Sequence, residues 1–146
     1  MRGDGAEPGA PPVRIVRVEL VGAGGQPQYV FEPGDALRVR ISYRCRQPID
    51  RPAFGMWIVR DDNVNCYGSN TRTAGPHIPR LEGRGSVTVT IPQLNLLDGG
   101  YLLSVMIGDE AATYDLWEHR LEFRVRQQDA DPTGLVFMPA KWAIDN

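Results

Sequence analysis

Apolar and polar residues alternate along most of this chain, and glycine, proline and aspartate separate the alternating stretches. In the clearest stretch, residues 37–46, every second residue is apolar, aromatic or cysteine, and arginine or serine stands between. A period of two is typical of a strand with one buried face. Similar stretches cover 16–20, 53–59, 87–91, 101–107 and 120–126, with shorter apolar pieces at 29–31 and 135–138. The pattern predicts an all-β antiparallel β-sandwich, and only residues 110–117 leave room for a helical turn.

Two of these predicted strands are apolar on both faces. Trp57 and Val59 alternate with the core set of the 53–59 strand, and Leu102 and Met106 do the same in the 101–107 strand. An antiparallel sheet with one face in water should be polar at those positions. We therefore expect another chain, the C-terminal segment or a ligand to cover this second face.

The 146 residues fit one domain with a core of its own. Residues 1–12 are rich in glycine, proline and alanine and are expected to form a flexible lead-in. The sandwich is expected over 13–142, with a tail at 143–146. Since 1–12 contains no apolar run like that of a signal peptide, we expect a cytoplasmic protein, with Cys45 and Cys66 as free thiols.

Charge adds two expectations. The net charge of −2 argues against a nucleic-acid partner. Nearly all the positive charge comes from arginine, and Arg38, Arg40, Arg44 and Arg46 form a stripe along one predicted strand. We expect this stripe to pair with Glu122 or Glu19 in a cross-strand charge ladder. The alternative is contact with an anionic glycan, a phosphate-bearing terminus or another subunit.

No catalytic or metal-binding motif stands out. His77 and His119 have no metal-ligand spacing to cysteine or carboxylate, and no Walker A, GxSxG, HExxH or CxxC sequence is present. The pairs at 61–62 and 109–110 could bind calcium or serve acid–base chemistry, with Asp61 or Asp109 in a glycan hydrolase. Adjacent acids at strand ends are more often solvated turn residues, so we predict no enzyme, cofactor or metal.

The order of five motifs resembles a known family. These are FEPGD at 31–35, PAFGMWI at 52–58, GSNT at 68–71, LDGGYLLSV at 97–105, and GLVF at 134–137 with Trp142. In this order, over about residues 13–142, they resemble the C-terminal domain of Wzt-type proteins. Those proteins are the ATPase subunits of ABC transporters that export O-antigen polysaccharide.

The resemblance implies an immunoglobulin-like sandwich, a non-catalytic module that binds the exported glycan in the cytoplasm, at the inner face of the inner membrane. It also implies a homodimer with exchanged C-terminal strands, and partnership with the ATPase domain and the membrane subunit. The nucleotide-binding domain that precedes this module in the family is absent from the sequence. We expect an excised domain, with a free-standing relative as the alternative.

Eight residues are predicted to bind the glycan: Trp57, Tyr67, Asn70, Arg72, Ser104, Met106, Tyr114 and Trp117. A pyranose ring packs its C–H face on indole, and amide and guanidinium groups bind hydroxyls. Each residue has a structural alternative. Trp57 would pack in a dimer interface, residues 68–71 would form a turn held by side-chain bonds, and Tyr114 and Trp117 would cap the sandwich end. A protein-binding sandwich that dimerises through its apolar face without sugar is the competing function.

Overall fold

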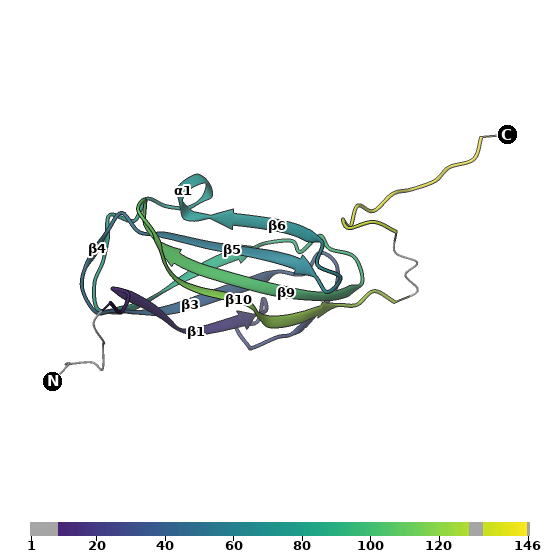
Figure 1. Ribbon diagram of the computed structural model, residues 1–146. Coiled ribbons are helices and arrows are strands. Elements are labelled where there is room, and N and C mark those ends of the chain that lie inside the picture. The colour runs from purple at the N-terminus through teal and green to yellow at the C-terminus, as the bar shows by residue number, and fades with distance from the viewer. Residues whose placement is uncertain (1–8, 129–132, 146) are drawn as a thin grey trace.

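The structure, a computed structural model, describes residues 9–128 and 133–145 and contains two packed β-sheets (Figure 1). Sheet A has the strand order β1 (Val13–Val21), β3 (Leu37–Cys45), β8 (Arg84–Ile91). Sheet B has the order β2 (Val30–Phe31), β10 (Thr113–Val125), β9 (Gly99–Gly108), β5 (Ala53–Arg60), β6 (Asn65–Asn70). A ribbon of β4 (Ile49–Asp50) and β7 (Arg80–Leu81) and the single-turn helix α1 (Thr71–Ala74) lie in the connections. The predicted all-β sandwich is confirmed.

The core lies between the two sheets because alternate residues of each strand point inward. In β3, Leu37, Val39 and Ile41 are at most 2% exposed, and the residues between them are half-buried or exposed. Sheet A adds Val13, Ile15, Val18 and Leu20, and sheet B adds Phe54, Met56, Ile58, Tyr101, Leu103, Val105, Ile107, Phe123 and Val125. The inward face of each sheet therefore supplies one half of the core, as the period of two predicts.

An aromatic cluster fills one end of this core. The Phe123 ring stacks on Tyr101 at 5.4 Å between centroids and meets Phe31 edge-on at 5.9 Å. Each such aromatic pair stabilises a fold by about 0.5–1.5 kcal/mol, beyond the contribution of the apolar area that it buries. The Tyr101 hydroxyl donates to the Leu97 carbonyl at 2.6 Å, and burial raises the pKa of Tyr101 to about 12. The hydroxyl is therefore a fixed donor that ties the loop before β9 to the core.

The first strand differs from its predicted register. Val16 was placed on the apolar face with Val18 and Leu20, but it is 52% exposed. A bulge shifts the pairing between Ile15 and Arg17, so that Val13 and Ile15 face the core before the bulge and Val18 and Leu20 face it afterwards. The prediction for Val16 was wrong because one extra residue inverts the alternation.

The 110–117 stretch is not helical. Residues 113–125 form one strand, β10, with register shifts between Thr113 and Asp115 and between Trp117 and Leu121. The strand predicted over 120–126 therefore begins earlier, at Thr113, and residues 113–119 are part of sheet B. The helical turn instead lies at α1, directly after β6.

The C-terminal segment follows β10 and extends away from the sandwich in Figure 1. It touches the domain through a bridge between Leu96 and Val136 and through the Phe137 amide, which donates to the Asn95 carbonyl at 2.8 Å. The predicted 135–138 piece thus forms a bridge and not a full strand. Among the residues described, none of the helices has the length and apolar character that a membrane crossing requires.

Candidate functional site

Sheet B carries the predicted apolar outer face. In the register of β5 with its neighbours, Trp57 pairs with Ser104 on β9 and with Gly68 on β6, while Met106 pairs with Gly55 and Leu102 with Val59. We call this surface the outer face of sheet B; it comprises Gly55, Trp57, Val59, Gly68, Asn70, Leu102, Ser104 and Met106. Trp57 is half-buried and lies outside the core cluster, on the face opposite Met56 and Ile58. The sequence pattern therefore places one continuous apolar surface on the outside of the sandwich.

Part of this face is closed by its own side chains. Val59 is only 6% exposed although it points away from the core. A Cβ atom on Gly55 would lie 3.1 Å from both Cγ and Sδ of Met106, so the Met106 side chain lies on the Gly55 backbone. Trp57, Leu102 and Met106 remain half-buried and form the accessible part. Gly68 and Ser104, the two direct neighbours of Trp57, are small, which leaves the indole accessible between them.

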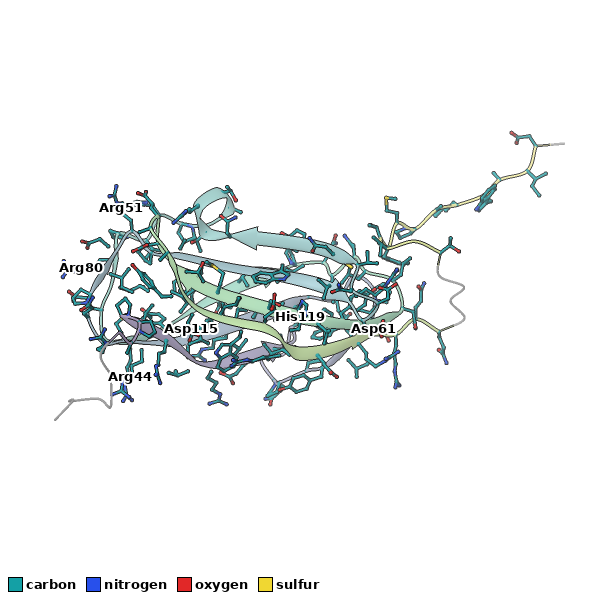
Figure 2. All side chains as sticks on the ribbon, in the orientation of Figure 1. Arg44, Arg51, Asp61, Arg80, Asp115 and His119 are labelled. Atoms are coloured by element: carbon teal, nitrogen blue, oxygen red, sulfur yellow. The ribbon has the colours of Figure 1, made fainter. Side chains whose placement is uncertain are left out.

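Ser104 has a structural role within this face. It is fully buried, and its Oγ accepts from the His119 amide at 2.8 Å. His119 has a left-handed backbone (φ 54°) in the irregular part of β10, between Trp117 and Leu121 (Figure 2). The Ser104 hydroxyl thus accepts a hydrogen bond from an amide at an irregular point of the strand pairing. Ser104 was predicted to contact the glycan, but it has no exposed surface to offer.

Asn70 begins the helix after β6. Its Oδ1 accepts from the amides of Arg72 and Thr73, both at 3.0 Å, in an N-cap. The Thr71 hydroxyl accepts from the Phe54 amide at 3.0 Å and anchors this turn to β5. These hydrogen bonds of Asn70 and Thr71 agree with the alternative in which residues 68–71 form a turn held by side-chain bonds. Arg72 projects from an exposed turn at the same end of β5 as Gly55.

Tyr67 lies on the other side of β6. It pairs with Ile58, a core residue, and it is 47% exposed. With Ile58, Cys66 and Leu94 it lines a cavity of about 320 Å³ between β6 and the loop before β9. Tyr67 therefore does not share a surface with Trp57.

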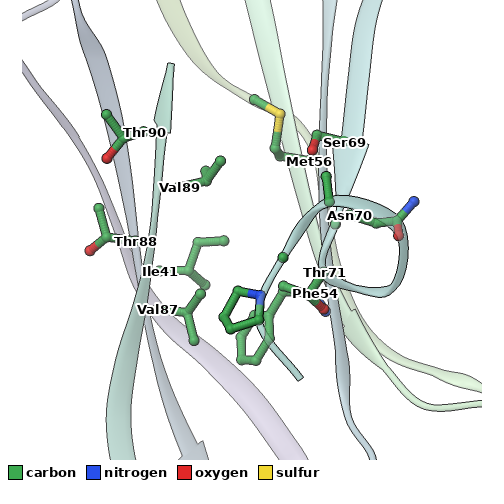
Figure 3. Close-up of a pocket in the computed structure, with 14 residues that line it drawn as sticks. Ile41, Phe54, Met56, Ser69, Asn70, Thr71, Val87, Thr88, Val89 and Thr90 are labelled. Carbon is green, nitrogen blue, oxygen red and sulfur yellow. The ribbon is translucent and has the colours of Figure 1, made fainter. Parts of the chain in front are cut away.

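A second opening, of about 230 Å³, lies farther along this edge, between β8 and the end of β6. Val87 and Val89 face it from β8, and Phe54, Met56 and Asn70 line its other side (Figure 3). Thr88 and Thr90 lie on the far side of β8 in this view. The two sheets thus separate along the β6–β8 edge and leave an apolar groove.

Tyr114 and Trp117 also lie away from Trp57. Trp117 pairs with Val105, a core residue, and both aromatic side chains pack against the core from its margin. The Arg120 guanidinium lies 5.0 Å from the centroid of the Trp117 ring. These contacts favour the alternative reading, in which the two aromatic residues close the margin of the sandwich.

Asp109, one of two suggested catalytic carboxylates, is held in a turn. Its Oδ2 accepts from the Tyr114 hydroxyl at 2.7 Å, and its Oδ1 accepts from the amides of Ala111 and Ala112. The Tyr114 bond is the largest cause that lowers the pKa of Asp109. The carboxylate therefore stabilises the β9–β10 turn as an anion, which is unsuited to a general acid.

The structure brings together a cluster of polar side chains that the sequence analysis did not predict. Tyr29, Asp61, Glu122 and Arg124 line a groove of about 470 Å³ together with Leu102. Tyr29 is 52% exposed, and a Cβ on Gly100 would lie 2.7 Å from Oδ2 of Asp61 and 3.3 Å from a terminal nitrogen of Arg124. We call this the Asp61 groove; it continues the outer face of sheet B at the end remote from α1 (Figure 2). The residues that line the Asp61 groove come from four separate stretches of sequence, so no local motif could predict the groove.

A smaller cavity of about 220 Å³ lies beside α1. Arg72, His77 and Glu110 are among the residues that line it. His77 is exposed at this cavity. In the described ranges 9–128 and 133–145, no group of three His, Cys, Asp or Glu side chains is arranged to hold a metal ion.

Two further predictions are resolved. Glu122 cannot pair with the arginine stripe, because it lies on β10 in sheet B and the stripe lies on β3 in sheet A. That half of the charge ladder was wrong. Glu19 does stand opposite Arg40 in the register, although its ion pair at 3.2 Å is with Arg17. Cys45 and Cys66 are free thiols, and burial raises the pKa of each.

Comparison with solved structures agrees with the fold class described above. The crystal structure of the C-terminal domain of Wzt superposes with a TM-score of 0.77 at 19% identity, over 92% of this chain and 84% of that one. A Bacteroides uniformis β-glucuronidase matches with a TM-score of 0.54 at 12% identity, over 74% of this chain and 14% of the enzyme. At such identities the likeness concerns the fold alone, an antiparallel β-sandwich that also occurs as one part of large glycosidases.

The sequence comparison identifies the family. The Wzt C-terminal domain family matches residues 5–138, most of the chain, and the protein belongs to this family. Among curated proteins, the O-antigen export system ATP-binding protein RfbB of Myxococcus xanthus is 27% identical over 138 residues. These residues cover 94% of this chain and 31% of RfbB, so the chain spans about a third of the length of that relative.

Proposed function

We propose that this domain is a non-catalytic carbohydrate-binding module that recognises an O-antigen-type polysaccharide for export by an ABC transporter. The observation that carries the proposal is the half-buried Trp57, which points outward at the centre of an apolar outer face. A solvated sheet face does not need tryptophan, valine, leucine and methionine side by side. The family of the chain and its likeness to an O-antigen export protein support the same function.

The outer face of sheet B suits an extended chain of sugars. From Gly55 to Arg60 the face runs roughly 17 Å, five residues at about 3.4 Å each. Trp57 and Met106 offer apolar surface for the C–H faces of pyranose rings. Arg72 lies at one end, and Asp61, Glu122, Arg124 and Tyr29 lie at the other. A ligand across the face would thus stack at the centre and exchange hydroxyl hydrogen bonds at both ends.

This arrangement refines the predicted ligand set. Trp57, Met106 and Arg72 stay in the proposal, and Asn70 borders it as the residue that fixes α1. Ser104 supports the face from beneath. Tyr67, Tyr114 and Trp117 contact the core side of the sheet and are left out. Tyr29, Asp61, Glu122 and Arg124 take their place.

The proposal includes a homodimer that exchanges C-terminal strands. Met138, Trp142 and Ile144 are 76%, 96% and 86% exposed on an extended segment, at a spacing that puts them on one side of a strand. In the described sheet, β6 is an edge strand next to Trp57. A tail from a second copy could pair with that edge and bury its apolar side chains, which removes two exposed surfaces at once.

The proposed setting is the cytoplasmic side of the inner membrane, with the transporter's ATPase domain and membrane subunit as partners. The likeness to the ATP-binding protein RfbB supports this assignment. The module would hold the finished glycan next to the exporter and would need no cofactor.

Calorimetric titration with O-antigen polysaccharides tests the function. Wild-type protein is expected to bind one polysaccharide saturably, and Trp57→Ala is expected to weaken binding at least tenfold, since stacking and apolar contact are both lost. The fold should remain, because Trp57 lies outside the core. Trp117→Phe is the matched control, since that ring faces the core margin, and it should bind like wild type.

The competing function is a protein-binding sandwich, and the exposed tail is the observation that favours it. Light scattering combined with the same titrations separates the two. A dimer that binds none of the polysaccharides, in wild-type form and at concentrations that saturate other glycan-binding modules, would contradict the proposed function.

A further inference from the structure

The outer face of sheet A carries a cluster of arginines that the proposed function does not use. Its outward positions hold six of the chain's 16 basic residues: Arg14 and Arg17 on β1, Arg38, Arg40 and Arg44 on β3, and Arg84 on β8. Glu19 is the only carboxylate on these strands at an outward position. We call this surface the arginine face. It is concentrated positive charge in a chain whose net charge is −2.

Three of the arginines stand directly side by side. Arg14 pairs with Arg44 across β1 and β3, and Arg44 pairs with Arg84 across β3 and β8. Among the described residues the ion pairs are Arg17–Glu19, Arg60–Asp62, Arg80–Asp50 and Arg80–Glu82, and none of them involves this row. Like charges opposite each other destabilise a sheet. A row that disfavours folding is a place to look for a function.

The form of this face narrows the choice of partner. Arg14, Arg44 and Arg84 line none of the four cavities described above, and Arg14 and Arg84 are exposed, so the row lies on open surface. Its outward positions hold arginine, serine, threonine and glutamate, with two valines, Val16 at the bulge and Val21 at the end of β1, and they include no aromatic residue. Single-stranded RNA binding uses aromatic stacking, and protein interfaces use aromatic anchors. Neither is present here.

We propose that the arginine face docks the domain on an anionic membrane surface by binding lipid phosphate groups. Guanidinium forks bind phosphate oxygens in pairs, and a pleated sheet offers several forks in one plane. A lipid surface demands charge and flatness but no shape complementarity, which matches what the face provides. The inference goes beyond the glycan site, since it concerns the opposite side of the sandwich and needs no polysaccharide.

Co-sedimentation with lipid vesicles tests the docking. The full chain is expected to bind vesicles of phosphatidylcholine with phosphatidylglycerol and not vesicles of phosphatidylcholine alone, and added salt should weaken the binding. The triple variant Arg14→Gln, Arg44→Gln, Arg84→Gln should lose roughly a hundredfold in affinity, about fivefold for each arginine. These exposed or half-exposed side chains contribute no core contacts, and circular dichroism checks the fold.

A charge-matched control gives the test its specificity. The control is the triple variant Arg80→Gln, Arg120→Gln, Arg126→Gln. It removes the same charge from β7, β10 and the residue after β10, and vesicle binding should change by less than threefold. Equal losses in both triple variants, or no binding of wild type to anionic vesicles at low salt, would overturn the proposal. Binding to single-stranded RNA as tight as to the vesicles, with the same loss in the first variant, would overturn it in favour of nucleic acid. Polysaccharide titration of the same variant stands apart, since the glycan proposal expects no change there.

Discussion

The two outer faces of the sandwich use the same backbone and carry opposite chemistry. On sheet A most outward positions are arginine, serine and threonine, exposed or half-buried, and neighbouring arginines repel one another. On sheet B they are Trp57, Val59, Leu102 and Met106, and even the outward Val59 is 6% exposed. Both sheets bury the same kind of inner face. The inner faces account for the fold, whereas the outer faces are where the two proposals place the partners.

The largest difference between the two outer faces is expected when the same charge is placed on each of them. Val59→Asp would bury a carboxylate on sheet B without a partner and should destabilise the domain by about 3–5 kcal/mol. Thr88→Asp puts the same group beside Arg40 on sheet A and should stabilise it by about 0.2–1 kcal/mol. Urea unfolding measures both. Equal costs would show that the two faces do not differ in solvent access.

A smaller difference is expected for serine. Ser104→Ala on sheet B leaves the His119 amide without its acceptor and should cost about 1–3 kcal/mol. Ser86→Ala on the outer face of sheet A should stay within about 0.5 kcal/mol, because Ser86 is exposed. Thermal unfolding of the two variants side by side checks this. A neutral Ser104→Ala would mean that water replaces the hydroxyl.

A third test predicts a gain of stability on sheet A. Arg44→Glu turns two like-charge neighbours, Arg14 and Arg84, into opposite-charge pairs and should stabilise the domain by about 0.5–1 kcal/mol at low salt. Molar salt should erase the gain. The same variant should bind anionic vesicles less well. A loss of stability at low salt would show that the arginine row is not in conflict with the fold.

The alternation along the chain was sufficient to predict the sandwich and the doubly apolar strands. The register of Trp57 with Gly68 and Ser104 follows from those strands once they are neighbours. The pattern failed where an extra residue enters a strand, as at Val16 and in the irregular part of β10 around His119. Alternation states which residues share a face, but it cannot state where that face inverts.

The site was less predictable because it depends on which strands are neighbours. Glu122 was assigned to the arginine stripe, yet β10 and β3 belong to different sheets. Tyr29, Asp61, Glu122 and Arg124 meet at one groove although they come from three separate stretches of sequence. Tyr114 and Trp117 were aromatic residues near an expected ligand, but a bulged strand turns them to the core margin. Such placements follow from topology, which residue spacing does not encode.

The central claim, that the outer face of sheet B binds a polysaccharide, is tested most directly by the emission of Trp57 alone. In the variant Trp117→Phe, Trp142→Phe, Trp57 is the remaining tryptophan of the three in the chain. Titration with the O-antigen polysaccharide that binds wild-type protein should shift and saturate this emission at the calorimetric affinity. If the polysaccharide binds with that affinity while the Trp57 emission stays constant, the ligand occupies another surface and the claim is contradicted.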